Sequence, residues 1–107
     1  IVLRADGTLD DIRLEGGPPF CITDYPWPVE PLTLAPGDTL VLVTDGVTEA
    51  QDAAGNLFGR QRLSAALRTA PAEPSALIAH VLAAVRTFEA GAPASDDLTL
   101  LAIRLKT

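Results

Sequence analysis

Two stretches of the chain are almost continuously apolar and rich in β-branched residues. The first is Leu40–Val43, within a segment that we expect to be a strand from Thr39 to Thr44. The second begins at Leu98, and we expect a strand to Leu105. Because the first run does not alternate apolar with polar residues, the pattern predicts a buried strand that is covered on both faces.

The region between these stretches has a helical period instead. Arg60–Thr69 is a predicted helix with Leu63, Ala66 and Leu67 on one face. The prolines between residues 71 and 74 interrupt the pattern, and Ser75 is a suitable N-cap for a second helix that ends near Glu89. Its apolar face consists of Leu77, Ile78, Val81, Leu82, Val85 and Phe88. This is the most amphipathic segment of the chain.

The N-terminal third has shorter apolar runs and more turn-forming residues. Ile1–Arg4 and Ile12–Leu14 flank Ala5-Asp6-Gly7-Thr8, which predicts a hairpin. Residues 20–31 hold three prolines and predict an irregular loop, and Pro31–Leu34 is a candidate edge strand. Ala35–Asp38 is a predicted turn.

The predicted order is therefore the strands of the N-terminal third, then the strand Thr39–Thr44, two helices and a last strand. This order favours an α+β fold with a layer of sheet against a layer of helices over an alternating βαβ fold. The 107 residues are enough for one domain, and 48% of them are apolar. We expect residues 1–107 to form a single domain with a packed core.

Charge and composition narrow the classes of function. The net charge of −6 disfavours binding to nucleic acid or to anionic lipid. No apolar stretch approaches the length of a membrane span. The single cysteine, Cys21, cannot form an internal disulfide, which fits a cytoplasmic protein. Because the chain begins at Ile1 and holds no methionine, we expect it to be a piece of a longer polypeptide.

Carboxylates gather where the two apolar stretches meet loops. Asp45 follows the first stretch, and Asp96 and Asp97 precede the second. A carboxylate beside a buried strand requires a cation or a donor, and oxygen ligands suit Mg²⁺ or Mn²⁺. The two strands are thus predicted to lie side by side and to bring these carboxylates together.

Each carboxylate also has an ordinary structural interpretation. Asp-Gly is a frequent turn dipeptide, and we interpret Asp6-Gly7 and Gly37-Asp38 as turns of this kind. Asp96 and Asp97, as neighbours in an extended segment, would point to opposite faces, so that only one of them could face an internal site. Glu49 is a candidate outer contact or an exposed helix residue.

Three ordered motifs resemble a known family. They are Pro36–Ala50 (PGDTLVLVTDGVTEA), Gly55–Leu63 (GNLFGRQRL) and Ser95–Leu101 (SDDLTLL), and Gly17–Ile22 (GPPFCI) precedes them. Together they resemble the SpoIIE/RsbU-type serine phosphatases, the bacterial branch of the PP2C-like (PPM) superfamily. The resemblance spans nearly the whole chain and places it in the C-terminal portion of the catalytic domain.

The resemblance implies a fold, a cofactor and a site. The fold is an αββα sandwich with antiparallel or mixed sheets and helices on the outside. Two Mn²⁺ or Mg²⁺ ions would activate a water that attacks a phosphoserine or phosphothreonine without a phosphoenzyme. Asp45 and Asp96 correspond to metal ligands, and Gly46 and Asp97 to supporting positions. The implied partners are a phosphorylated protein such as an anti-sigma-factor antagonist, an upstream sensor domain and, as one assembly, a homodimer.

Two departures from the family keep an alternative open. The family's first metal-binding motif is missing, so half of the metal site is absent and the chain alone is expected to be inactive. A regulatory or interaction module of PP2C-like fold is therefore the alternative to an active phosphatase. Cys21 replaces a usual glycine, and we interpret it as an inert, partly buried residue.

Other candidate side chains carry weaker signals. His80 has no ligand-spaced partner and is expected at the surface or beside the core. Tyr25 and Trp27 are expected to cover the sheet edge, although they could form a partner-binding patch. Arg60 and Arg62 are expected on a solvated helix face, although they could contact a phosphate.

Overall fold

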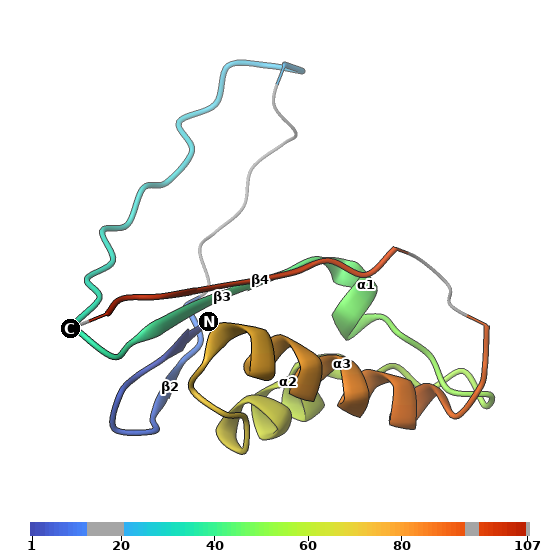
Figure 1. Ribbon diagram of the computed structural model, residues 1–107. Helices are drawn as coiled ribbons and strands as arrows, with labels where there is room; N and C mark the ends of the chain where they lie inside the picture. Colours follow the sequence, from blue (N-terminus) through green and yellow to red (C-terminus); the bar gives the residue numbers. More distant parts are fainter. Residues whose placement is uncertain (13–20, 94–96, 107) are drawn as a thin grey trace.

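The computed structural model describes residues 1–12, 21–93 and 97–106. A four-stranded sheet lies against two long helices, as Figure 1 shows. In chain order the elements are β1 (Val2–Leu3), β2 (Leu9–Asp10), β3 (Thr39–Val43), α1 (Asp45–Thr48), α2 (Gly59–Arg68), α3 (Pro74–Glu89) and β4 (Leu100–Arg104). The predicted α+β class is confirmed, with one sheet layer and one helix layer.

The sheet has the order β2-β1-β3-β4, and every neighbouring pair is antiparallel. The pair of β3 and β4 is the longest, and its register runs from Thr39 opposite Arg104 to Val43 opposite Leu100. The prediction that the two apolar stretches lie side by side is therefore confirmed. Their pairing brings together segments that lie more than fifty residues apart in the sequence.

Both predicted helices are present, and α3 begins differently from the prediction. Glu73, rather than Ser75, caps α3: its carboxylate accepts hydrogen bonds from the backbone N–H groups of Ser75 and Ala76 at 3.2 and 2.8 Å. Pro74 follows as the first helical residue, where its missing N–H costs nothing. Ala90, with φ 50°, ends the helix in the left-handed conformation. In the described part of the chain, no helix is long and apolar enough to cross a membrane.

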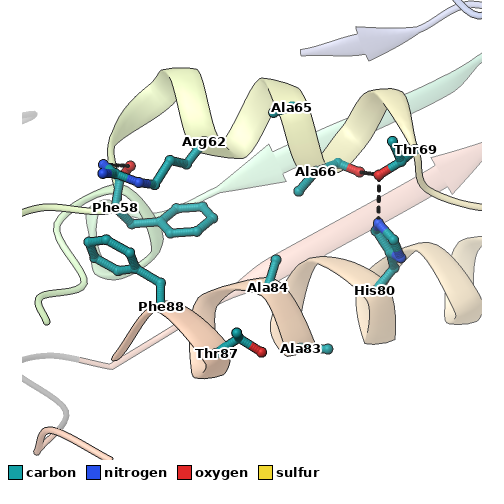
Figure 2. A pocket seen from close by; sticks show the side chains of 10 residues that line it. All are labelled: Phe58, Arg62, Ala65, Ala66, Thr69, His80, Ala83, Ala84, Thr87 and Phe88. Carbon is teal, nitrogen blue, oxygen red and sulfur yellow. Dashed lines mark hydrogen bonds between the residues drawn. The ribbon is translucent and has the colours of Figure 1, made fainter. Parts of the chain in front are cut away.

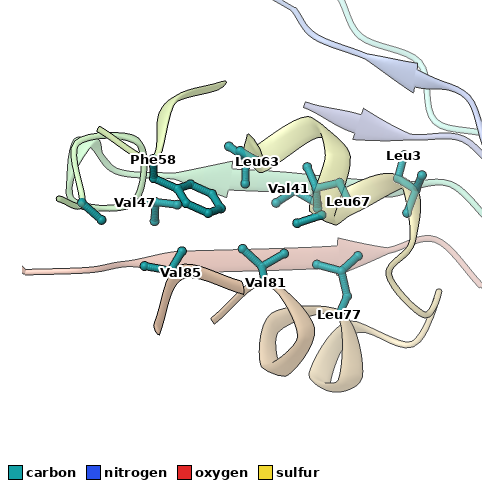
Figure 3. Packing of buried hydrophobic residues seen from close by; sticks show 11 residues of the cluster. Leu3, Val41, Val47, Phe58, Leu63, Leu67, Leu77, Val81 and Val85 are labelled. Atoms are coloured by element: carbon teal, nitrogen blue, oxygen red, sulfur yellow. The ribbon is translucent and has the colours of Figure 1, made fainter. Parts of the chain in front are cut away.

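The core lies between the sheet and the two helices. Figure 3 shows its side chains pointing into this layer: Leu3, Val41, Val47, Phe58, Leu63, Leu67, Leu77, Val81 and Val85. The predicted helix faces account for it, since Leu63, Leu67, Leu77, Val81 and Val85 are all fully buried. The apolar area removed from water here is the main stabilising contribution to the fold.

The other face of the sheet is open in this chain. Leu42, Leu101, Ile103 and Leu105 are 49, 48, 50 and 41% exposed, while Val41 on the opposite face is 2% exposed. The prediction that β3 is covered on both faces is therefore wrong for the chain by itself. The absence of alternation in Leu40–Val43 nevertheless has a physical meaning, because a row of large apolar side chains on an open sheet face is typical of a surface that packs against another layer.

The N-terminal hairpin is confirmed, but its second strand begins earlier than predicted. Leu9 and Asp10 pair with Leu3 and Val2, whereas Ile12 lies outside any strand and Arg13 and Leu14 lie outside the described residues. The turn is tight because the Asp6 carboxylate accepts hydrogen bonds from the backbone N–H and the hydroxyl of Thr8 at 2.9 and 2.7 Å. Pairing can therefore start directly after Thr8.

The predicted edge strand at Pro31–Leu34 is wrong, since these residues form no strand. The prolines of this region lack the N–H groups that a ladder needs. Residues 21–34 instead extend away from the sheet, as the cyan trace in Figure 1 shows. The predicted irregular loop is confirmed for its described part, residues 21–31.

Candidate functional site

The end of β3 and the approach to β4 meet through a pair of hydrogen bonds. The backbone N–H of Thr44 donates to the carbonyl oxygen of Thr99 at 3.1 Å. The backbone N–H of Thr99 in turn donates to the Thr44 hydroxyl at 3.2 Å. This arrangement extends the β3–β4 ladder by one residue and brings the segment Thr44–Gly46 beside Asp97–Thr99.

Gly46 makes the approach of the two segments possible. Gly46 is buried, and a Cβ atom on it would lie 2.8 Å from the carbonyl carbon of Asp97 and closer still to its carbonyl oxygen. The same atom would lie 3.3 Å from Cα of Leu98. Backbone occupies the space of the missing side chain, so no other residue fits here without moving one segment. The predicted supporting position of Gly46 thus has a structural cause.

Asp45 is the first residue of α1, a single helical turn. It follows Thr44, and the backbone N–H of Glu49 donates to its carbonyl oxygen at 2.8 Å. The Asp45 residue is exposed, and its carboxylate has no hydrogen bond or ion pair within the described ranges. The carboxylate is therefore available to bind a cation. Glu49, also exposed, ends this turn, in agreement with its predicted exposed position.

The structure covers the second acidic segment only in part. Asp97 is described and exposed, and its backbone is the group that Gly46 contacts. Asp96, the second predicted metal ligand, lies outside the described residues. Among the residues that are described, no group of three or more histidine, cysteine, aspartate or glutamate side chains could hold a metal ion. The described residues thus form one part of a metal site and not a complete ligand set.

The donors that are present fit a hard divalent cation. Asp45 offers carboxylate oxygens, which are the ligand type that Mg²⁺ and Mn²⁺ prefer, and the exposed Asp97 lies in the adjoining segment. No described cysteine or histidine lies in this corner, so a soft-ligand site for zinc or copper has no support in these segments.

Thr44 is the functional-site residue that sequence reasoning missed. Its hydroxyl accepts the Thr99 N–H instead of capping α1, and it thereby fixes the position of the residue before Asp45. The sequence offers only a weak signal for this pairing, because Thr44 adjoins Asp45 whereas Leu98 separates Thr99 from Asp97.

The weaker candidates are not part of this corner. Cys21 is exposed, so its predicted partial burial is wrong, and its φ of 71° places it in a turn that extends away from the core. Tyr25 and Trp27 contact one another, with ring centroids 5.4 Å apart. They lie in the segment that extends away from the sheet, so the prediction that they cover the sheet edge is wrong.

His80 and Arg62 line a groove of about 550 Å³ between α2 and α3, shown in Figure 2. His80 Nε2 lies 2.9 Å from the Thr69 hydroxyl and links the two helices, which confirms its position beside the core. The Arg62 guanidinium lies over the Phe88 ring, 4.5 Å from its centroid, and Arg60 pairs with Asp11. Within the described residues neither arginine lies at the acidic corner.

Comparison with known proteins agrees with this geometry. Residues 1–106 match the family model described as stage II sporulation protein E (SpoIIE). The fold is similar to that of the phosphatase domain of the cell fate determinant SpoIIE from Bacillus subtilis, with 19% identity and a TM-score of 0.59 over 71% of this chain and 35% of that one. The same domain in a form presoaked with manganese gives 18% identity and a TM-score of 0.58, over 70% of this chain and 34% of that one.

A third similar structure is the SiaA-PP2C domain of Pseudomonas aeruginosa, at 30% identity and a TM-score of 0.56. This match covers 70% of the chain and 31% of that domain. The chain therefore spans about a third of the length of the solved phosphatase domains that it matches. None of the curated protein sequences is significantly similar to it.

Proposed function

The chain belongs to the SpoIIE family, and on this premise we propose that it is the C-terminal portion of a metal-dependent phosphatase domain acting on phosphoserine or phosphothreonine in a protein. The observation that supports the proposal most strongly is the contact of Gly46 with the backbone of Asp97. It brings the two acidic segments to one corner of the sheet and leaves the Asp45 carboxylate exposed there. The likeness to the SiaA-PP2C domain at 30% identity supports the same reaction class.

In the complete domain, Asp45 and Asp96 would each offer carboxylate oxygens to a Mn²⁺ or Mg²⁺ ion, with two ions in all. Such ions, when bound, supply a water of lowered pKa as the nucleophile for phosphoryl transfer. The residues of this chain have the task of holding the ligands in place. Thr44 fixes the end of β3 through Thr99, Gly46 lets the backbones approach, and Asp97 supports the corner beside the predicted ligand.

The open face of the sheet supports the expectation that the chain alone is inactive. Its large apolar side chains are about half exposed, and the chain spans only about a third of the matched domains. In an αββα sandwich such a face would pack against a second sheet. The 107-residue chain alone is therefore expected to be inactive, and residues 1–107 form one portion of a larger domain.

The proposed setting is bacterial signalling in the cytoplasm. The substrate class is a phosphorylated protein regulator such as an anti-sigma-factor antagonist, with a sensor domain upstream in the parent chain and a homodimer as one assembly. These proposals rest on the family and on the negative charge of the chain, which disfavours nucleic acid as a partner.

A non-catalytic regulatory module is the second candidate. It rests on the departure noted in the sequence, namely that the family's first metal-binding motif is missing from these 107 residues. The two candidates differ in what the parent protein does with a phosphorylated substrate: an active phosphatase releases phosphate, and a regulatory module binds its partner without turnover.

The test is a phosphatase assay of the full-length parent with Mn²⁺ and p-nitrophenyl phosphate. Asp45→Asn and Asp96→Asn are each expected to lower kcat/KM by about 100-fold or more, since losing even an outer contact of a metal costs about 10–100-fold. Asp24→Asn, which alters an exposed carboxylate in the loop that extends away from the sheet, is the matched control and should keep its activity. Unchanged activity in both site variants would refute the assignment, and an inactive parent that still binds its partner would favour the regulatory module.

A further inference from the structure

A second cavity lies at the opposite end of the β3–β4 pair from Asp45. It has a volume of about 170 Å³, and Thr39, Arg68 and Arg104 line it. Since a water molecule occupies about 30 Å³ in the liquid, the cavity has room for a small polyatomic ion. The length of β3 separates it from the acidic corner, so it is no part of the proposed metal site.

The strand register explains why these side chains converge. Thr39 is directly opposite Arg104 in the β3–β4 ladder, and residues paired in this way point to the same face of a sheet. Thr39 shares this face with Val41, which is buried against the helices. Arg68 stands in the last turn of α2, on the helix side of the same cavity.

Thr39 is a buried residue with an unused polar group. It is 1% exposed, and its hydroxyl has no hydrogen-bond partner among the described residues. A buried hydroxyl without a partner is destabilising, and such groups are rare in native proteins. An additional acceptor in the cavity would remove this cost.

Both arginines are exposed and differ from the other arginines in the described part of the chain, which have partners. Arg4, Arg60 and Arg86 pair with carboxylates, and Arg62 donates to backbone carbonyls and lies over Phe88. Arg68 and Arg104 make no hydrogen bond or ion pair there. In a chain with a net charge of −6, two unpaired guanidinium groups share a single cavity.

The Glu73 carboxylate, on which the charge of Arg104 acts, is already engaged. Hydrogen bonds from the N–H groups of Ala76 and Ser75 lower the pKa of Glu73, and the charge of Arg104 adds a smaller contribution. Because both Glu73 oxygens cap α3, this side chain stays at the helix terminus and does not close the cavity.

We propose that Thr39, Arg68 and Arg104 form a binding site for a small oxyanion of the phosphate class, remote from the metal centre. Each guanidinium can donate two parallel hydrogen bonds to such an anion, and the Thr39 hydroxyl can donate one more. The anion is free phosphate or the phosphoryl group of a phosphoserine. This site goes beyond the proposed phosphatase function, and its occupancy requires no metal ion.

The test is an NMR titration of the isotope-labelled parent polypeptide, in EDTA, with inorganic phosphate in one arm and phosphoserine in the other. Phosphate is expected to shift the amide signals near Thr39, Arg68 and Arg104 and to leave those of Asp45 and Gly46 unchanged. Shifts with phosphate alone would identify free phosphate as the ligand, and shifts with both ligands would show that the site also accepts the phosphoryl group of a phosphoserine.

Arg68→Gln and Arg104→Gln are each expected to weaken binding about tenfold, since each removes charge-assisted hydrogen bonds. Thr39→Val should weaken binding about threefold while leaving the ligand-free protein as stable as before or more so, because it removes an unpaired buried hydroxyl. Lys106→Gln removes the same charge two residues from Arg104 without lining the cavity, and it should bind phosphate normally.

Three results would overturn the proposal. They are the absence of shifts near the cavity with either ligand, shifts that are spread over the whole surface, and a loss of affinity in Lys106→Gln equal to that in Arg104→Gln. Because the titration contains no metal and measures no turnover, its failure would leave the phosphatase assignment untouched, and an inactive parent would leave this site untouched.

Discussion

The same strand separates two aspartates that look alike in sequence and differ in structure. Asp38 precedes β3 and follows Gly37, and Asp45 follows β3 and precedes Gly46. Asp38 is 3% exposed and accepts hydrogen bonds from the N–H groups of Ala5 and Ala35 and from Arg4, at 2.8, 2.9 and 3.0 Å. Asp45 is exposed and has no such partners within the described residues.

The difference shows how a structural carboxylate is distinguished from one that is available to a ligand. The Asp38 carboxylate joins the hairpin to the turn before β3, and its hydrogen-bonding capacity is used within the fold. The Asp45 carboxylate contributes no described contact, while the backbone around it is tightly constrained at Gly46. A constrained backbone that presents an unused carboxylate is typical of a binding site.

Gly46→Ala is expected to have the largest effect on stability at the Asp45 end. The new Cβ would overlap the Asp97 backbone, so one of the two segments must move. Overpacking of this kind costs about 2 kcal/mol or more, which urea unfolding would measure. The amide signals of Asp97–Thr99 should shift as well.

Gly55→Asn is the matched control for that variant. No atom lies within 4 Å of a Cβ on Gly55, and asparagine tolerates its positive φ of 84° better than other residues do. Its unfolding free energy should change little. Equal losses in both variants would show that the close approach at Gly46 does not matter.

Asp38→Asn is expected to lower the melting temperature without changing metal binding. An asparagine can replace only one of the two oxygens that accept hydrogen bonds, and its NH₂ group would then face the N–H donors of the site. Asp45→Asn should leave the melting temperature unchanged, since its carboxylate has no described partner. Thermal unfolding followed by circular dichroism compares the two, and equal melting temperatures would contradict the distinction.

Protonation of Asp38 at low pH should also lower the unfolding free energy, by less than the substitution Asp38→Asn does. Hydrogen bonds from the N–H groups of Ala35 and Ala5, followed by the one from Arg4, lower the pKa of Asp38 in the folded protein. Its stabilising contribution is therefore present above the unfolded pKa of about 4 and is lost as the pH falls through the lower folded value. Unfolding free energies measured from pH 6 downwards should fall more steeply in the original chain than in Asp38→Asn. Parallel curves would contradict this.

The long elements could be predicted from the sequence because each has a clear period. The helices α2 and α3 follow from apolar spacing, and β3 and β4 from continuous apolar runs. The acidic corner also follows, since adjacent strands must bring Asp45 towards the segment before β4. The interpretation of Gly37-Asp38 as a turn is confirmed by the hydrogen bond from the Asp38 N–H to the Ala35 carbonyl oxygen at 3.0 Å.

What could not be predicted depends on contacts that a linear pattern does not contain. The early start of β2 results from hydrogen bonds between Asp6 and Thr8, and the beginning of α3 from the Glu73 carboxylate. The open face of β3 depends on what else packs against the sheet, which apolar spacing within one strand cannot reveal. The metal-ligand roles of Asp45 and Asp96 remain predictions.

Titration of the isotope-labelled chain with Mn²⁺ reveals whether the Asp45 corner binds a metal ion, because a paramagnetic ion broadens nearby amide signals even when it binds weakly. We expect broadening confined to the residues around Asp45 and Asp97, none around Asp38, and its loss in Asp45→Asn. Broadening that persists in Asp45→Asn, or that centres on Asp38, would contradict the assignment of the acidic corner as a metal site.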